Sequence, residues 1–350
     1  MKLSLIDTFQ QPEGKSAKQV LEESFQLAQQ AEALGCDGYW MAEHHFSNYG
    51  IMGSPLLFAA AVAQRTKTIK IGIGILVLPL YDPVRLAEEC ALADVLCDGR
   101  LQVGVGRGYQ PAEFAGFRVD QGKSRALADE VQEILELAWT QEKFSYEGEF
   151  FKLSNLSILP RPIQQPHPPI YKAASSMESF QAAGEKGMRI LTSPNITPLD
   201  TMRRQFETYE AALSAAGFDP KLYSKPVMQK VYIGTDADDA HETPREPALR
   251  FHRQLATHVL PPEGEKPKGY EVWDKISKNM AEITYEKILE HGSIFATPDV
   301  AAEKLRELQG IGVDTFLAFP RFGGMPHDKL MASMERLALD VMPRLQPQHA

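Results

Sequence analysis

Strand-like and helix-like segments alternate along this chain from its first residues almost to its last. Such alternation is typical of an α/β fold with a parallel sheet, because a parallel strand needs a crossover helix before the next one. Eight strand-like segments follow one another: KLSLIDTF, GYWMAEHHF, TIKIGIGILVLP, RLQVGVGRG, PIYKAASS, RILTSP, KPVMQKVYIG and DTFLAFP. Eight parallel strands close a barrel, so we predict a TIM (β/α)8 barrel with residues 1–350 in a single domain.

Three segments depart from this alternation. FSYEGEFFKLSNL, near 144–156, has a Glu-Gly turn between aromatic flanks and predicts a hairpin excursion. RPIQQPHPP is proline-rich, but the alternation resumes directly after it, so we interpret it as a surface loop within the domain. The stretch near 240–296 is too long for one connecting helix, and we predict an insertion that forms a lid over the carboxyl end of the barrel.

Charge and composition argue against several partners. With 37 Lys and Arg against 46 Asp and Glu, the formal net charge is -9, whereas a surface for nucleic acid or an acidic membrane needs an excess of basic residues. No segment reaches the length of a membrane span and the first residues do not resemble a signal peptide, so we expect a cytoplasmic protein without membrane or nucleic-acid partners. The three cysteines are odd in number and lack CxxC spacing, which indicates buried free thiols.

The stretch GYWMAEHHFSNY begins as a buried strand and runs into an acid and two adjacent histidines. Polar residues directly after a buried strand indicate the carboxyl edge of a parallel sheet, where active sites lie. On a continued strand Glu43 and His45 share one face and His44 takes the other, which makes the two histidines a poor metal pair. A histidine packed at the barrel rim and a functional histidine facing a cavity both stay open, and we favour the second.

A phosphate site is predicted at two other strand exits. Arg107 follows the glycine-rich VGVG, and Ser175, Ser176 and Ser179 stand at the start of a helix in ASSMES. Helix-start amides, hydroxyls and a guanidinium together suit a phosphate, although serines at these positions also serve as ordinary helix caps. Hydrolytic chemistry finds little support, because the sequence has no GxSxG elbow and Glu43 is the one clear carboxylate at a strand end.

Several runs resemble the bacterial luciferase-like flavin monooxygenases: AEHHF, NYGIMGSP, VLPLYDPVRLAEECALADVLCDGRLQVGVGRG, KSRALAD and DVMPRL. The resemblance covers nearly the whole chain and is strongest through residue 130. It implies a TIM barrel that binds reduced FMN supplied by a separate flavin reductase. It further implies a reaction with O2 to a C4a-peroxyflavin that oxygenates a small organic substrate, aldehyde-like or otherwise apolar.

The resemblance also implies roles for individual residues. His44 matches the family's catalytic histidine and His45 the histidine beside it, so both are candidate catalytic residues, and no metal is implied. The candidate FMN-binding residues are Glu43, Gly74 and Ile75 at a non-prolyl cis peptide, Arg107 with Ser176 and Ser179 at the phosphate, Ser175 in place of an acid, and Arg125 near the phosphate or the flavin edge.

Three departures from the family pattern bear on the substrate. Gly106 stands where luciferase has a reactive cysteine, and the small Ser193 stands where it has a bulky aromatic residue. The lid, Leu255 to Glu290, keeps KGY and Trp273 but diverges beyond them. These differences alter the pocket rather than the phosphate site, so light emission and a long-chain aldehyde substrate do not follow from the resemblance.

Two other functions remain open. Related barrels transfer hydride with a deazaflavin (F420), and a non-catalytic flavin-binding subunit of a heterodimer would share much of the pattern. Two helices, near 54–66 and near 83–97, resemble the family's dimer interface and predict a homodimer. The first is rich in alanine, and small residues allow close helix approach. Packing of the alanine-rich helix on its own barrel is the alternative.

Overall fold

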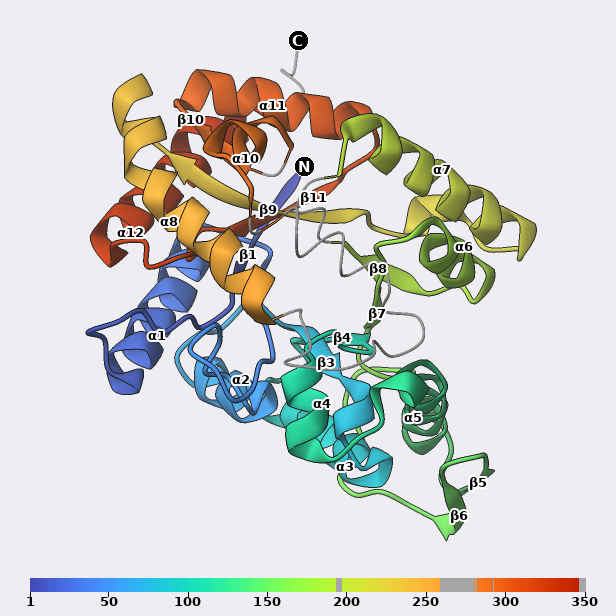
Figure 1. The fold of residues 1–350 in the computed structure, drawn as a ribbon. Helices are drawn as coiled ribbons and strands as arrows, with labels where there is room; N and C mark the ends of the chain where they lie inside the picture. Colours follow the sequence, from blue (N-terminus) through green and yellow to red (C-terminus); the bar gives the residue numbers. More distant parts are fainter. Residues whose placement is uncertain (193–196, 259–279, 281, 292, 346–350) are drawn as a thin grey trace.

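One parallel sheet curls into the wall of a barrel in the computed structural model, which describes all residues except 193–196, 259–279, 281, 292 and 346–350 (Figure 1). The strand order is β10-β9-β11-β1-β2-β3-β4-β7-β8. A bridge between Thr192 and Val227 joins the end of β8 to β9, where the Met228 N–H donates to the Thr192 carbonyl at 3.0 Å. The predicted TIM barrel is therefore confirmed. The strands are β1 (Lys2–Asp7), β2 (Gly38–Met41), β3 (Lys70–Val77), β4 (Leu101–Gly106), β7 (Ile170–Ala173), β8 (Arg189–Leu191), β9 (Pro226–Ile233), β10 (Ser293–Ala296) and β11 (Thr315–Phe319).

The strand β10 is not among the eight predicted strands. It pairs with the carboxyl-terminal half of β9, with Ser293 opposite Lys230 and Ala296 opposite Ile233. Its four residues, SIFA, lie between the predicted lid and the next helix, and a run this short carries little periodicity. In the described residues the sheet thus has the eight predicted strands and this ninth one beside the end of β9.

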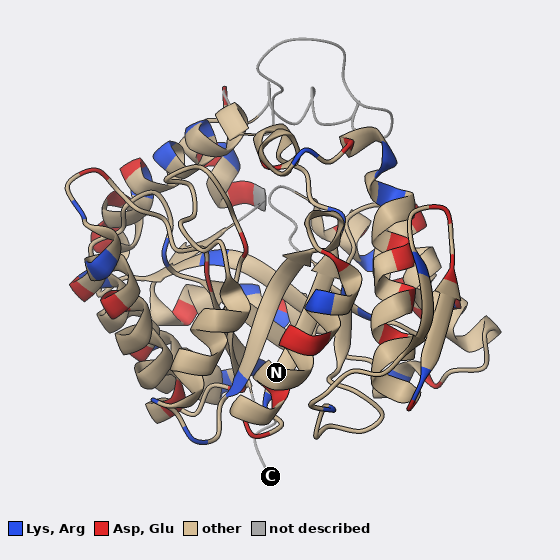
Figure 2. Cartoon of the chain, turned by 90° about the horizontal axis from the view of Figure 1, so that it is seen from below, with Lys and Arg blue, Asp and Glu red and all other residues tan. Residues whose placement is uncertain are grey.

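Helices surround the sheet (Figure 1). Figure 2 shows acidic and basic residues interspersed along them. None of the helices in the described part of the chain is both long and apolar enough to cross a membrane. The helices are α1 (Ala17–Ala33), α2 (Pro55–Ala63), α3 (Pro83–Leu96), α4 (Pro111–Phe117), α5 (Ser124–Thr140), α6 (Met177–Glu185), α7 (Leu199–Ala215), α8 (Ala237–His258), α10 (Tyr285–His291), α11 (Pro298–Gly310) and α12 (His327–Arg336).

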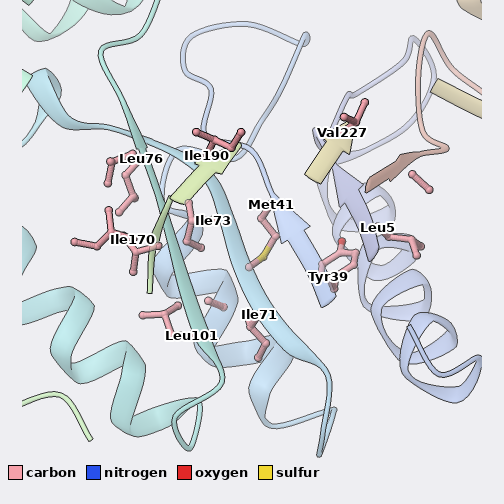
Figure 3. Close-up of a cluster of buried hydrophobic side chains, with 14 of the residues drawn as sticks. Leu5, Tyr39, Met41, Ile71, Ile73, Leu76, Leu101, Ile170, Ile190 and Val227 are labelled. Carbon is pink, nitrogen blue, oxygen red and sulfur yellow. The ribbon is translucent and has the colours of Figure 1, made fainter. Parts of the chain in front are cut away.

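Side chains alternate between two cores along each strand, as the period of two requires. The outer core lies between the sheet and the helices and includes Leu5, Tyr39 and Ile71 (Figure 3). The inner core fills the barrel and includes Ile6 and Trp40. All three cysteines, Cys36, Cys90 and Cys97, are free and buried, as predicted.

Glycines occupy the inward-facing positions of β3 and make room for large neighbours. A Cβ at Gly72 would come within 2.1 Å of the Trp40 ring, so the indole needs a glycine there. At Gly74 a Cβ would lie 3.2 Å from Leu191 and 3.3 Å from Ile6, which places this glycine in the barrel interior. At these two positions the backbone of β3 carries no side chain, so large neighbours can approach it closely from inside the barrel.

The predicted hairpin is present, whereas the predicted lid region contains more regular structure than expected. β5 (Phe144–Glu147) and β6 (Lys152–Leu156) pair antiparallel. Within 240–296 lie most of α8, all of α10 and all of β10, so a long loop is the wrong description of these parts. Two prolines inside α8, at 244 and 247, hide its helical pattern, because proline usually ends a helix. KGY, Trp273 and Ser193 lie outside the described residues.

The start of β3 is held by one carboxylate of α1. Glu32 Oε1 accepts the backbone N–H groups of Lys67 at 2.7 Å, Thr68 at 2.6 Å and Ile69 at 3.0 Å. Partial burial raises the pKa of Glu32, but these hydrogen bonds outweigh it and lower the pKa to about 2. The carboxylate therefore stabilises the fold above its unfolded pKa of 4.5, and the stabilisation is lost as the pH falls from there through about 2.

We expect Glu32→Gln to lower the free energy of unfolding at pH 7 by about 1–2 kcal/mol, after discounting for solvent exposure. Urea unfolding at pH 7 and pH 3 measures this free energy. The loss of free energy of unfolding relative to the unsubstituted protein should be smaller at pH 3 than at pH 7. Glu22→Gln, an exposed position of the same helix, is the control. Equal losses of stability in Glu32→Gln and Glu22→Gln would contradict the stabilising role of Glu32 at the start of β3.

Candidate active site

The strand β2 ends at Met41, so the acid and the two histidines lie in the loop that follows it. Glu43 is buried. Its Oε1 lies 2.8 Å from His45 Nε2, and its Oε2 accepts the backbone N–H of Val77 at 2.9 Å. The shared face predicted for Glu43 and His45 assumed a continued strand, whereas here the two side chains contact each other in the loop, and Glu43 joins the β2 exit to the end of β3. It does not present a free carboxylate to the barrel.

His44 turns toward α4, a short helix that is not among the elements predicted from the sequence. Its Nδ1 lies 3.2 Å from Glu113 Oε1 and 2.8 Å from Gln110 Nε2. The same Glu113 oxygen accepts the backbone N–H of His45 at 3.0 Å. Glu113 is 1% exposed, so this carboxylate is committed to orienting the two histidines. Pro111 at the first position of the helix, with Glu113 in its first turn, is the sequence signal that indicates α4.

The two neighbours of His44 Nδ1 favour different protonation states of the ring. An Nδ1 that donates to Glu113 carries a proton, whereas an Nδ1 that accepts from Gln110 does not. In the second state the neutral ring carries its proton on Nε2. Within the described part of the chain Nε2 has no hydrogen-bond partner and is not among the fully buried polar atoms. His44 can therefore hold a proton at Nε2 or give it up while Glu113 and Gln110 keep the ring in place.

Aromatic side chains surround the ring of His44. The ring of Tyr49 lies 4.8 Å from it and that of Tyr109 lies 6.1 Å from it, measured between centroids. Burial raises the pKa of Tyr49 well above its ordinary value and that of Tyr109 to about 12, so both phenols are neutral at physiological pH. From α8, Phe251 contacts Tyr49 at 5.8 Å. Tyr49 and Tyr109 thus give His44 neutral aromatic neighbours beside the Glu113 carboxylate. Burial and the charge of His44 lower the pKa of His258.

The predicted phosphate residues lie at neighbouring strand exits. Because Val105 of β4 pairs with Lys172 of β7, Arg107 and Ser175 leave the same edge of the sheet from adjacent strands. Ser176 is the N-cap of α6, and its side chain accepts the Ser179 N–H at 3.3 Å. Ser179 Oγ in turn accepts the N–H groups of Ser175 at 3.0 Å and Ser176 at 2.9 Å. The serines form a helix cap in this structure, which was the alternative interpretation.

An anion already lies at this helix start. Hydrogen bonds from its own N–H and from the Ser176 side chain lower the pKa of Glu178, in the first turn of α6, and the charge of Arg125 contributes to the shift. Arg125, in the first turn of α5, therefore faces the same helix end. An acidic side chain in the first turn is stabilised by the positive end of the helix dipole, and the same helix end would also favour the charge of a phosphate. The residues present at this edge fit a phosphate.

The peptide bond between Gly74 and Ile75 is cis, at the position that the resemblance implies. Ile75 follows it and packs over β4. A Cβ at Gly106 would come within 2.2 Å of Ile75 Cδ1, so a cysteine at position 106 would require the Ile75 side chain to shift. At this position the backbone of β4 and the side chain of Ile75 form one apolar wall.

Metal ligation has no counterpart in the geometry of the described residues, where no group of three or more His, Cys, Asp or Glu side chains could hold an ion. His44 and His45 each pair with a separate carboxylate, Glu113 and Glu43, instead of converging on one point. The site has a histidine whose Nε2 is unengaged in the described residues, an apolar wall of Ile75 and β4, and the serine-capped start of α6 at a neighbouring strand exit.

Comparisons with known proteins give a consistent assignment. A sequence model of the family described as luciferase-like monooxygenase matches residues 1–315. The oxygenase component of the flavin-dependent trigonelline monooxygenase of Acinetobacter baylyi is 26% identical over 351 residues, which cover 94% of this chain and 91% of that protein. An alkanal monooxygenase alpha chain of Photorhabdus luminescens is 31% identical over 263 residues, which cover 75% of this chain and 72% of that protein.

Solved structures with the same fold include monooxygenases and deazaflavin enzymes. The monooxygenase RslO1 from Streptomyces bottropensis has a TM-score of 0.85 and 29% identity, covering 99% of this chain and 100% of that chain. The oxygenating constituent of 3,6-diketocamphane monooxygenase from Pseudomonas putida, solved with FMN, has a TM-score of 0.80 and 22% identity over 99% of each chain. An F420-dependent secondary alcohol dehydrogenase has a TM-score of 0.75 and 17% identity over 99% of each chain. At these identities the last two share the fold alone.

Proposed function

Because the chain belongs to the luciferase-like monooxygenase family and is a flavin-dependent monooxygenase, we propose that it is the oxygenase of a two-component system. A separate reductase would supply reduced FMN, and the chain would use it with O2 to oxygenate a small organic substrate. The observation that carries this proposal is the pairing of His44 with buried Glu113 beside an apolar, glycine-lined barrel wall.

The proposal assigns FMN binding to residues at two edges of the site. Arg107 and the first turn of α6 would hold the phosphate, with Arg125 adding positive charge, in place of the Glu178 carboxylate. Gly74 and Ile75 would border the ring system. When bound, reduced FMN supplies the electrons that activate O2 for transfer of one oxygen atom to the substrate.

His44 is the proposed acid–base group. Its Nε2 would hold or release one proton at the reacting centre, while Glu113 and Gln110 fix the ring through Nδ1. Tyr49, Tyr109 and Phe251 exclude water from this edge, which strengthens the electrostatic effect of the single proton. His45 has a structural role in the proposal, as the partner of Glu43, because its Nε2 is already bound to that carboxylate.

Hydride transfer with a deazaflavin is the second candidate, and the structural similarity to an F420-dependent dehydrogenase motivates it. Relatives that are more similar in sequence than this dehydrogenase include monooxygenases, which favours FMN and O2. A non-catalytic flavin-binding subunit is the third candidate, and the intact His44–Glu113 pair argues against it.

Formation of an oxygenated product by the purified chain discriminates the three candidates. We expect oxygen incorporation into an added organic substrate when reduced FMN is delivered by an unrelated flavin reductase, with catalase present to remove free peroxide. A reaction without the chain is the control, because free reduced FMN also consumes O2. Reduced deazaflavin should not replace FMN. Activity with the deazaflavin alone would support the hydride transferase, and flavin binding without oxygen chemistry would support the non-catalytic subunit.

A homodimer through α2 and α3 is proposed from an exposed apolar surface. These helices lie side by side and leave Leu57 74%, Leu92 47% and Leu96 44% exposed. Apolar residues clustered at a surface indicate an interaction site.

We expect Leu57→Glu combined with Leu92→Glu to shift the protein from dimer to monomer in light scattering after size exclusion. Leu339→Glu, 56% exposed on another face, should leave the dimer intact. A monomer before substitution would contradict the proposal.

A further inference from the structure

The last two turns of α8 lie against the loop that follows β2. Phe251, Leu255 and His258 recur every three or four residues, so they share one face of the helix. Phe251 and Leu255 belong to the inner core of the barrel. One turn before His258, Gln254 Nε2 donates to Asn48 Oδ1 at 2.8 Å, which joins the helix to the loop. The third residue of this face, His258, has no role in the chemistry described so far.

Tyr49 is the residue of the loop on which this face of α8 packs. The centroid of its ring lies 5.8 Å from that of Phe251 and 5.3 Å from that of His258. The same ring lies 4.8 Å from the ring of His44. Tyr49 is 3% exposed, and its hydroxyl is hydrogen-bonded to Tyr109. Tyr49 is thus held by α8 and by Tyr109, and in turn it contacts His44.

Charge as well as packing connects His258 with the candidate active site. Burial and the positive charge of His44 lower the pKa of His258, whereas the negative charge of Glu113 acts in the opposite direction. Glu113 is also the carboxylate that lies 3.2 Å from His44 Nδ1. The two imidazoles therefore lie in the field of one carboxylate, and a cation on either disfavours a cation on the other.

The ring of His44 is bordered by two helices that are far apart in the sequence. α4 supplies Glu113 and Gln110, which hold Nδ1. α8 supplies Phe251 and His258, which pack on Tyr49. A substitution on this face of α8 therefore changes the surroundings of His44 without removing either of its hydrogen-bond partners.

We propose that His258 is a further residue of the active site, contributed by α8: it holds Tyr49 against the ring of His44 and lies close enough to His44 and Glu113 for the charges of the three groups to depend on one another. It is a positioning residue, because it acts on the acid–base group through Tyr49. The inference rests on the proposed monooxygenase function, since His44 is the acid–base group of that reaction.

Titration of histidines by NMR tests the proposal without any flavin. In protein labelled with 13C at histidine Cε1, the signal of His258 is the one missing from His258→Phe. We expect the pKa of His258 to rise in His44→Gln, which removes a positive charge, and to fall in Glu113→Gln, which removes a negative one. His167, which precedes β7 at the opposite edge of the sheet and packs on Trp139, is the control, and its signal should be the same in all these proteins.

Substitutions at position 258 test the contact with Tyr49. His258→Ala removes the ring and should slow single-turnover oxygenation about 2- to 10-fold, the range that one aromatic contact supports. His258→Phe should restore most of the rate at pH 8, because a neutral aromatic ring makes the same contact with Tyr49. Arg253→Ala, at an exposed position of the same helix, is the matched control and should turn over at the unsubstituted rate.

Several results would overturn the proposal. One is a His258 signal that neither His44→Gln nor Glu113→Gln moves, or that both move in the same direction. Another is a turnover rate of His258→Ala equal to that of the unsubstituted protein, and a third is a rate of His258→Phe no higher than that of His258→Ala. The NMR titrations decide the matter if His258→Ala does not fold.

The result is separable from that of the proposed function. If the signal of His258 moves as expected but the chain forms no oxygenated product with reduced FMN, the link between His258 and His44 stands and the monooxygenase proposal fails. If product forms but the titration of His258 is insensitive to both substitutions, the monooxygenase proposal stands and the role of His258 fails.

Discussion

Replacing His44 by alanine is expected to slow substrate oxygenation by about 100- to 10,000-fold while reduced FMN still binds. The reason lies in the geometry of the ring: Nδ1 is held by Glu113 and Gln110, which leaves Nε2 to hold or release the proton. Without the imidazole no other titratable group of the described loop takes its place, because His45 is bound to Glu43. Single-turnover product formation, measured beside a flavin-binding titration, separates the two effects.

Two further substitutions sharpen this prediction. Glu113→Gln keeps the shape of the side chain but removes its charge, so it should shift the pH profile of turnover and slow it less than His44→Ala does. His45→Ala should lower protein stability, because it leaves the buried Glu43 without its histidine partner. Normal turnover in His44→Ala, or a larger catalytic loss in His45→Ala at equal stability, would contradict the assignment of the two histidines.

Arg107→Ala should weaken the binding of reduced FMN by about 10- to 150-fold, since a hydrogen bond to a charged group contributes about 1.5–3 kcal/mol. Arg107 leaves the sheet edge next to Ser175, at the helix start where Glu178 already lies. A lysine at this position keeps the charge but not the bidentate geometry. The affinity of Arg107→Lys for reduced FMN should therefore lie between that of the unsubstituted protein and that of Arg107→Ala.

The measurement is an anaerobic fluorescence titration with reduced FMN, repeated with reduced riboflavin, which lacks the phosphate. The substitution should affect FMN and leave riboflavin almost unchanged. Arg118→Ala, at the exposed end of α4, serves as the control. An equal loss for both flavins would show that Arg107 acts on the ring system or on the fold instead of the phosphate.

The fold could be predicted because nearly every strand carries its own signal. Buried parallel strands such as β3 and β4 appear in the sequence as continuous apolar runs, and helices separate one run from the next. Eight such strands define the barrel. The strand β10 and the full helix α8 could not be predicted, for different reasons. β10 has four residues, which is too short for a periodic pattern. α8 contains prolines 244 and 247, which in a sequence argue against a helix.

The candidate site was predicted in part. The histidines stand out because polar residues follow a buried strand abruptly, but the partner of His44 lies 69 residues further along the chain, at Glu113. Such a contact depends on how the loop after β4 returns to the barrel, and no local pattern contains it.

Anaerobic titration of the purified chain with reduced FMN, followed by rapid mixing with O2, decides whether this barrel is the oxygenase of a two-component system. We expect about one reduced FMN to bind per chain. The bound flavin should reoxidise more slowly than free reduced FMN, and oxygen should be incorporated into an added organic substrate. Failure to bind reduced FMN, or reoxidation of the flavin at the rate seen without protein and with no product, would contradict the account.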